Sequence, residues 1–252
     1  MDLSERPGTP VRRHPWETAR LDAVRRILAG LGLHEPRVLD VGCGDGYLVR
    51  ELRAPLHFRH VVAQDIHMSE ELAQELSAPG VEFVRELTQI EYRADLILLL
   101  DVLEHLPEPR ALLMDLVRQR LAPGGRCLIT VPAFQGLFTD HDRALKHFRR
   151  YSRTELVRLV ESAGLDVLDS GYLFASLLLP RGVSALRERA ARRRQREANG
   201  AVRGVGAWSG SRWVTQAAHA ALCLDGRLCL MARQGGITLP GLTVWLTCKT
   251  RS

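Results

Sequence analysis

Hydrophobic positions along the chain follow two periodicities, and segments of the two kinds alternate. From Trp16 to Gly32 apolar residues recur every three to four positions, which predicts a helix with Gly32 as its C-cap. Short apolar runs then alternate with helical segments. The predicted strands cover 38–42, 60–65, 81–84, 95–100, 126–131, 165–172 and 242–249, and the further predicted helices cover 46–53, 69–77, 108–121 and 153–163. This order predicts an α/β protein with a doubly wound, mostly parallel seven-stranded sheet.

The segment 95–100 indicates where a ligand site lies. After Asp95 it is uniformly apolar, as expected of a parallel strand that is buried on both faces. Asp101 follows directly, at the carboxyl end of that strand. Open α/β sheets bind their ligands at this edge, so Asp101 is a candidate site residue.

A long insertion precedes the last strand, where a hairpin would need only a short loop. Residues 174–240 contain a predicted Arg-rich helix (183–198), a Gly/Ser loop (200–211) and a second helix (212–233) with an uncharged run from Trp213 to Leu224. The second helix packs on the core, forms a substrate lid or a dimer interface, or lies on a bilayer surface. We divide the chain into a cap helix (1–36), a core (37–173), a helical insertion (174–240) and a final core strand (241–252).

Composition is that of a soluble protein, with 46% hydrophobic and 25% charged residues among 252. The five cysteines are odd in number and lack zinc-type pair spacing, which favours free thiols in a reducing cytosol. The N-terminus has no apolar signal core, and no run reaches the about 20 apolar residues of a membrane span. We therefore expect a cytoplasmic protein, with peripheral contact at the inner membrane face as an option.

The net charge of +6 comes largely from one arginine cluster. Its members are Arg187, Arg189, Arg192, Arg193, Arg194 and Arg196. A solvated helical face is the simplest interpretation, and an anionic membrane surface or a phosphorylated substrate is the alternative. Nucleic acid is not expected as a partner, because no aromatic residues for base stacking lie between the arginines.

A glycine-rich turn follows the first predicted strand. Its pattern is G-x-G-x-G from Gly42 to Gly46, with acids at Asp40 and Asp45. A phosphate cradle generally has a Lys or Arg, whereas acids suit a cationic ligand such as S-adenosylmethionine. The dinucleotide fingerprint G-x-G-x-x-G is an alternative that the spacing disfavours, although Asp65 lies where a carboxylate would bind ribose hydroxyls.

Four segments in this order resemble those of class I S-adenosylmethionine-dependent methyltransferases. They are Val38–Gly46, the strand that ends at Asp65, Ala94–Leu106 and Leu121–Pro132. The resemblance covers residues 12–172 and the terminal strand. It implies a Rossmann-like methyltransferase fold, S-adenosylmethionine as cofactor and methyl transfer as the activity.

The resemblance also implies roles for individual residues. Asp40 and the turn would surround the methionine part of the cofactor, Asp65 would bind the ribose, and Asp101 would lie beneath the sulfonium. The implied cofactor-binding set is Asp40, Gly42, Cys43, Gly44, Asp65, Ile66, Glu86, Asp101, Val102 and His105. In one departure, Leu87 stands where such enzymes often have an Asp for adenine, and Glu86 is the expected substitute.

The segment Thr139–Ser152 is the expected acceptor-binding loop. It holds two histidines, two acids and a basic-aromatic cluster. Together with His14 and Trp16, it resembles a bacterial subgroup linked to glycolipid, cell-envelope or natural-product pathways. The implied acceptor is a small or lipid-linked molecule, and the candidate residues that bind it are Trp16, Arg149, Arg150 and Tyr151.

A neutral imidazole suits proton removal from a hydroxyl or an amine. His141, oriented by Asp142, is the first candidate base, His147 the second and His105 the third. Each histidine could instead brace the loop. A carboxylate acceptor would need no base, and Arg149 or Arg150 would bind it.

Two further interpretations remain open. A metal site made from Asp140, His141, Asp142 and His147 is not expected, because their spacing is not diagnostic. A catalytically silent module that recruits a partner through the insertion is the alternative function. Retention of Asp40, Asp65 and Asp101 favours the enzyme.

Overall fold

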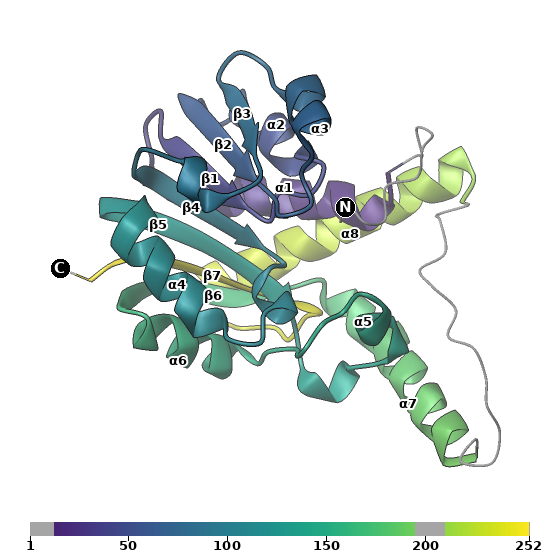
Figure 1. The fold of residues 1–252 in the computed structure, drawn as a ribbon. Helices are drawn as coiled ribbons and strands as arrows, with labels where there is room; N and C mark the ends of the chain where they lie inside the picture. Colours follow the sequence, from purple (N-terminus) through teal and green to yellow (C-terminus); the bar gives the residue numbers. More distant parts are fainter. Residues whose placement is uncertain (1–12, 195–209, 252) are drawn as a thin grey trace.

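The computed structural model describes residues 13–194 and 210–251, with side chains described for 13–191 and 210–251. Its centre is a seven-stranded sheet of order β3-β2-β1-β4-β5-β7-β6, in which β7 runs antiparallel to both neighbours (Figure 1). The strands are β1 (Arg37–Val41), β2 (His60–Gln64), β3 (Val81–Val84), β4 (Ala94–Leu100), β5 (Leu121–Pro132), β6 (Leu165–Leu173) and β7 (Thr243–Thr250). The predicted doubly wound fold is thus confirmed.

Helices cover both faces of the sheet (Figure 1). The α-helices are α1 (Pro15–Ala29), α2 (Tyr47–Arg53), α3 (Glu70–Leu76), α4 (Pro109–Asp115), α5 (Asp140–Ala144), α6 (Arg153–Ser162), α7 (Leu178–Arg194) and α8 (Arg212–Gln234). One apolar cluster joins the sheet to α1, α2, α3 and α8, and a second joins the other face to α4 and α6. β4 contributes Leu96, Leu98 and Leu100 to the first cluster and Ile97 and Leu99 to the second, as expected of a strand buried on both sides.

The helix expected at 108–121 is divided. α4 ends at Asp115, and a π-helical turn (Leu116–Arg120) leads into β5. The guanidinium of Arg93 donates hydrogen bonds to the carbonyls of Arg118 and Leu121, at 2.6 and 2.9 Å. These bonds satisfy backbone acceptors that a regular helix would have used.

Two other elements differ from the expectation. Residues 140–144 form α5 rather than a loop, because Thr139 and Asp142 make a reciprocal capping box. α7 begins at Leu178 instead of 183, and Pro180 lies in its first turn, where proline is tolerated. Residues 200–209 of the predicted Gly/Ser loop lie outside the described residues.

The two insertion helices have different surroundings (Figure 1). α8 packs on α1 and β6, and its Asp225 accepts hydrogen bonds from the backbone N–H groups of Ala175 and Ser176, at 3.1 and 2.9 Å. α7, the first helix of the insertion, lies beside α5 and away from α1. No described helix is long and apolar enough to cross a membrane.

Candidate active site

The carboxyl ends of three neighbouring strands form the site. β1 pairs in parallel with β2 and β4, so the residues that follow or end these strands meet at one edge of the sheet. This places Asp40, Asp65 and Asp101 together, as their positions at strand ends predicted. Asp40 and Asp65 are buried, and Asp101 is half-buried.

Glycine is required in the turn between β1 and α2. Gly42 and Gly46 have φ of 71° and 67°, in the left-handed region. A Cβ on Gly42 would lie 2.7 Å from Cγ2 of Val102, and one on Gly46 would clash with the ring of Phe83. The turn therefore presents bare backbone, which fits the close approach of a ligand.

Hydrogen bonds tie this turn to the end of β2. The N–H groups of Gly42 and Cys43 donate to the carbonyl of Gln64, at 2.8 and 2.9 Å. The N–H of Gly44 donates to Oδ2 of Asp65 at 2.9 Å, and Oδ1 of Asp65 accepts from His67 N–H at 2.9 Å. Asp65 thus fixes the loop, and its role toward a ribose stays a prediction.

Asp40 carries the clearest electrostatic perturbation of the cradle. Burial raises the pKa of its carboxyl to about 7, with the charge of Arg20 opposing and that of Asp65 adding to the rise. Burial and the nearby acids also raise the pKa of the Cys43 thiol. A cationic group such as the ammonium of S-adenosylmethionine would relieve this accumulation of acids, so the cradle fits that cofactor.

Arg20 reaches from α1 to the end of β4. Its guanidinium lies 2.8 Å from Oδ2 of Asp101, while the hydroxyl of Thr130 donates to Oδ1 of Asp101 at 3.1 Å. Asp101 has φ of 60°, which is uncommon for a residue other than glycine and recurs at ligand sites. The role of Arg20 as the partner of Asp101 was not predicted, since nothing local in the sequence connects these residues.

Asp45 is paired inside the protein. Its carboxylate forms an ion pair with Arg13, whose guanidinium lies over the ring of Tyr47, 3.9 Å from its centre. Burial opposes ionisation, but the hydrogen bond from Arg13 lowers the pKa of Asp45 overall. Of the two acids expected to face the ligand, Asp45 therefore already has a partner in the protein, and Asp40 stays the candidate.

The other predicted cofactor residues border the same edge. Ile66 follows Asp65 and is 66% exposed, so its apolar side chain is available to a flat ring. Val102 follows Asp101 directly, and His105 ends the 3-10 turn (Leu103–His105) that comes next. Glu86 is exposed after β3 and accepts a hydrogen bond from the Thr88 hydroxyl at 3.1 Å.

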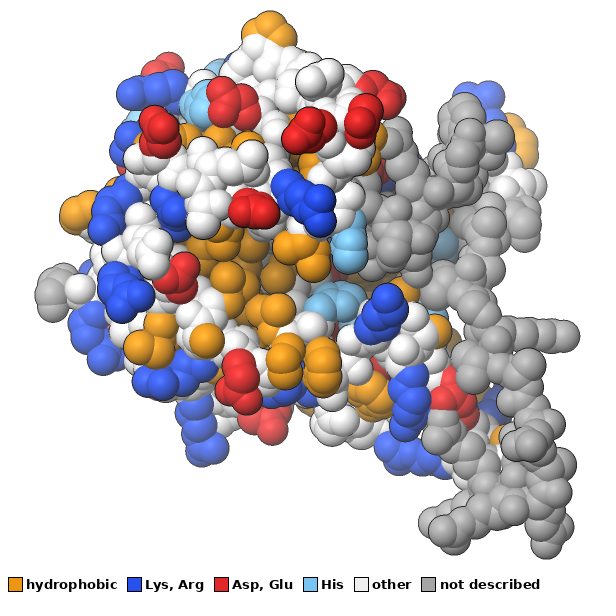
Figure 2. All heavy atoms as spheres, in the orientation of Figure 1, with side chains coloured by type: hydrophobic (Ala, Val, Ile, Leu, Met, Phe, Trp, Pro, Cys, Tyr) orange, Lys and Arg blue, Asp and Glu red, His pale blue; other side chains and the backbone are white. Residues whose placement is uncertain are grey.

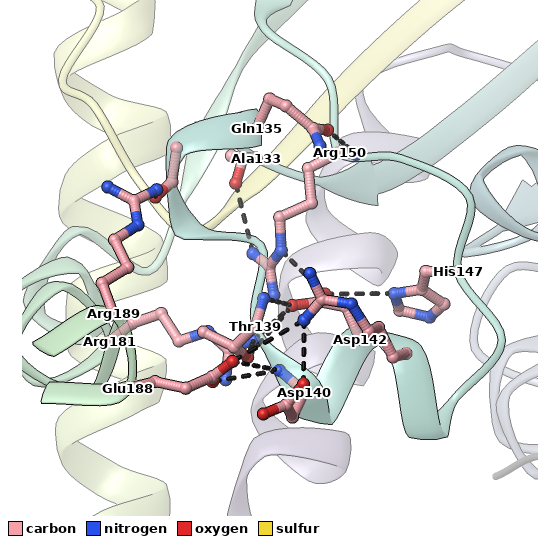
Figure 3. A network of polar contacts seen from close by, with 12 residues as sticks. Ala133, Gln135, Thr139, Asp140, Asp142, His147, Arg150, Arg181, Glu188 and Arg189 are labelled. Carbon is pink, nitrogen blue, oxygen red and sulfur yellow. Dashed lines mark hydrogen bonds and ion pairs between the residues drawn. The ribbon is translucent and has the colours of Figure 1, made fainter. Parts of the chain in front are cut away.

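Asp142 is the centre of a polar network in the acceptor loop (Figure 3). Its side chain is fully buried and accepts from Thr139 N–H at 2.8 Å, Arg150 Nε at 2.7 Å and Arg181 at 2.6 Å. Nδ1 of His147 lies 3.2 Å from Oδ1 of Asp142. Burial opposes ionisation, yet these partners, His147 first among them, hold the pKa of Asp142 far below its usual range.

The predicted acceptor-binding residues also have partners within the protein. Arg150 is buried and donates to the carbonyl of Ala133 at 3.2 Å, and Arg149 donates to that of Pro107 at 2.8 Å. The Tyr151 hydroxyl donates to the carbonyl of Leu103 at 3.2 Å, and burial raises the pKa of Tyr151 to about 12. Trp16 packs against Phe174, with ring centres 6.5 Å apart. The structure thus gives these four residues bracing contacts and leaves their roles toward an acceptor as predictions.

The three candidate bases differ in their surroundings. The rings of His105 and His147 meet edge to face, with centres 4.6 Å apart. His141 is exposed on α5, and partial desolvation together with the charge of Arg181 lowers its pKa. Asp142 contacts His147, whereas the sequence interpretation paired it with His141. Next to His105 lies buried Glu104, which no sequence pattern singled out.

Comparison with known proteins identifies the family. Residues 13–170 match the model of a methyltransferase domain. The chain belongs to the class I S-adenosylmethionine-dependent methyltransferases. S-adenosylmethionine is accordingly its cofactor, and the glycine turn with buried Asp40 fits that molecule.

Curated relatives of this methyltransferase include ubiquinone biosynthesis O-methyltransferases. The one from Aeromonas salmonicida (strain A449) is 28% identical over 169 residues, which cover 58% of this chain and 70% of the relative. The one from Xylella fastidiosa (strain 9a5c) is 31% identical over 131 residues, and the match spans 46% of this chain and about half (49%) of the relative.

Solved structures show the same fold at low identity. A SAM-dependent methyltransferase from Archaeoglobus fulgidus has a TM-score of 0.54 and 16% identity, covering 92% of this chain and 94% of its own. The N-methyltransferase NodS from Bradyrhizobium japonicum WM9, solved with S-adenosyl-l-homocysteine, has a TM-score of 0.54 and 14% identity, covering 100% and 95%.

Proposed function

We propose that this methyltransferase moves the methyl group of S-adenosylmethionine to an oxygen, nitrogen or carbon atom of a small-molecule or lipid-linked acceptor, with His141 as the base for a protic acceptor. The supporting observation is the position of the acceptor loop. His147 of this loop contacts His105, which lies in the turn that follows Asp101. The relatives named for ubiquinone biosynthesis are consistent with an oxygen acceptor on a lipid-linked molecule.

The residues of the cradle would align the reaction. S-adenosylmethionine supplies an electrophilic methyl group when bound. We propose that Asp40 and the glycine turn hold the methionine part, that Asp65 holds the ribose, and that Arg20 and Thr130 fix Asp101 beneath the reacting centre. In-line displacement depends mainly on such alignment.

His141 is favoured as the base for two reasons. Its lowered pKa keeps the imidazole neutral near pH 7, and its side chain reaches solvent, where an acceptor can approach. His147 stays the second candidate, with Asp142 orienting its ring. Trp16 and Arg149 are proposed to contact the acceptor, while Arg150 and Tyr151 are proposed to hold the loop in place.

Replacing His141 tests this assignment. The His141→Ala variant should turn over at least ~100-fold more slowly, because it loses general-base catalysis, while its affinity for S-adenosylmethionine stays unchanged. An extract of small molecules and lipids supplies the acceptor, and the same fraction of it is used for every variant. Turnover is measured as the rate at which labelled methyl groups pass from S-adenosylmethionine to that fraction. His34→Ala, at an exposed histidine before β1, is the control. Full activity of His141→Ala would leave His141 a structural role.

We further propose that the insertion lets the enzyme contact an anionic membrane surface. The outer side of α8 exposes the apolar side chains of Trp213, Leu224, Leu228 and Met231. Arg187 and Arg189 of α7, the other helix of the insertion, are also exposed. The side chains of Arg192, Arg193 and Arg194, and all of Arg196, lie outside the described residues. An exposed apolar helix face fits a bilayer interface, with the arginines of α7 as a separate basic segment of the insertion, and a homodimer contact is the alternative.

A further inference from the structure

Glu104, His105 and His147 form a cluster to which the methyl-transfer scheme assigns no joint role, and Glu104 has no part in that scheme. One ligand atom from each residue lies within 4.8 Å of those of the other two. Glu104 and His105 come from the turn after β4, and His147 comes from the loop after α5. The backbone joins these segments, since Phe148 N–H donates to the carbonyl of Glu104 at 2.7 Å. The cluster is therefore held together by the fold.

The carboxyl group of Glu104 is the unusual member. The residue is 1% exposed, and its Oε2 atom has no hydrogen-bond partner among the described residues. Buried polar atoms are normally paired, because leaving one unpaired costs about 1–3 kcal/mol. A cation between Glu104 and the two imidazoles would satisfy this oxygen.

His147 is already oriented as a metal ligand would be. Its Nδ1 faces Oδ1 of Asp142 at 3.2 Å, so its Nε2 is directed away from that carboxylate. Metal-bound histidines commonly have a carboxylate on their second nitrogen, which fixes the ring. Asp142 is in turn held by Arg150 and Arg181, which keeps this arrangement rigid (Figure 3).

We propose that Glu104, His105 and His147 bind a divalent transition-metal ion, of which Zn²⁺ is the best match. Two imidazoles and one carboxylate are a typical zinc donor set. Three protein ligands leave a coordination position open. Glu104 lies close enough to Asp101 for their charges to interact, so the ion would border the methyl-transfer site. Figure 2 shows histidine side chains at the border of a hollow with apolar walls on this face of the molecule.

The open position would receive the acceptor. A hydroxyl oxygen bound there would become more acidic and would give its proton to His141. The oxygen then forms the new bond to the methyl carbon, the bond from sulfur to that carbon breaks, and its electron pair stays on sulfur to give S-adenosylhomocysteine. This catalytic role rests on the proposed function, whereas metal binding itself does not.

Zinc content of the full chain tests the site. Untagged protein is dialysed against Zn²⁺ and analysed by mass spectrometry for metal, with S-adenosylmethionine binding measured in parallel. We expect about one Zn²⁺ per chain. Glu104→Gln, His105→Gln and His147→Gln should each weaken zinc binding by at least about 10-fold. His141→Gln, a nearby exposed histidine, should retain it.

Three results would overturn the proposal. The first is a wild-type chain that binds no zinc. The second is a Glu104→Gln/His147→Gln variant that still binds S-adenosylmethionine and keeps its full zinc content. The third is a loss of zinc in the His141→Gln variant and in no other. If the double variant does not fold, the wild-type chain is loaded with Co²⁺ in place of Zn²⁺ and its visible absorption spectrum is recorded. Strong visible d–d absorption is then expected, and its absence counts against the site. Zinc binding without S-adenosylmethionine binding would instead contradict the proposed function and leave the metal site standing.

Discussion

At the scale of single residues, the site is shaped by acids that the protein brings together and then partly neutralises. Arg13 pairs with Asp45 and Arg20 with Asp101. Asp40 stays fully buried with its pKa near 7, and is therefore partly protonated at neutral pH. A charged ligand group is the natural partner for it.

This arrangement predicts that cofactor affinity depends on pH. Asp40 must be ionised to attract the ammonium group, so binding releases a proton from the protonated fraction. Affinity for S-adenosylmethionine should therefore rise as pH increases from below the pKa of about 7, and level off above it. Titration calorimetry between pH about 5.5 and 8.5 measures the rise and the plateau. Asp40→Asn should bind weakly with little pH dependence, and a wild-type affinity that stays flat would contradict the assignment.

The residues at strand ends were predictable, and their cationic partners were not. Asp65 and Asp101 follow apolar runs whose carboxyl ends must meet in a parallel sheet. Arg13 and Arg20 meet Asp45 and Asp101 only through packing between distant segments, which no spacing in the sequence encodes.

At the scale of elements, α7 is anchored to the acceptor loop by its polar side chains. Arg181 donates to Oδ2 of Asp142 at 2.6 Å and to the Thr139 hydroxyl at 2.7 Å. Glu188, two turns further along α7, accepts from Asp140 N–H at 3.0 Å (Figure 3). The insertion therefore helps to position the histidines of that loop.

Removing this anchor should loosen the loop. Arg181→Met deletes a charged partner of buried Asp142, so the free energy of unfolding should fall by about 1–3 kcal/mol. Backbone amides of 139–151 should also exchange hydrogen faster. Chemical denaturation and exchange mass spectrometry measure the two effects. Arg187→Met, at an exposed position of the same helix, should change neither; equal behaviour of the two variants would contradict the anchor.

Elements with clear periodicity were predicted to within a few residues, including α8 and six of the strands, whereas β5 begins at Leu121 instead of 126. α5 was missed because it is a short helix created by the capping box of Thr139 and Asp142. The early start of α7 was missed because Pro180 favours a break in the sequence pattern, although proline is compatible with a first turn.

At the scale of the whole molecule, the two sides of α8 are both largely apolar. Leu222 and Cys229 face the core, while Trp213, Leu224 and Met231 are 81%, 58% and 64% exposed. An exposed apolar face of this kind marks an interaction surface. The partner that we propose for this face is an anionic membrane.

Vesicle binding tests this surface. The protein should co-sediment with vesicles that contain phosphatidylglycerol, and less so at high salt. Leu224→Glu/Leu228→Glu should weaken binding by about 10-fold or more, because each apolar side chain contributes about 1.5–3 kcal/mol when fully buried. Leu168→Glu, an exposed apolar position on β6, is the control. Unchanged binding in the double variant, or a dimer without lipid that the variant loses, would contradict the membrane assignment.

The central claim is that the edge formed by β1, β2 and β4 binds S-adenosylmethionine for catalysis. The most direct measurement is calorimetric titration of the purified chain with S-adenosylmethionine and, separately, with S-adenosylhomocysteine. Micromolar binding of both is predicted, with a loss of about 1–3 kcal/mol in Asp65→Ala, which removes the hydrogen bonds expected with ribose. Absence of binding by both ligands, or an unchanged affinity in Asp65→Ala, would contradict the account.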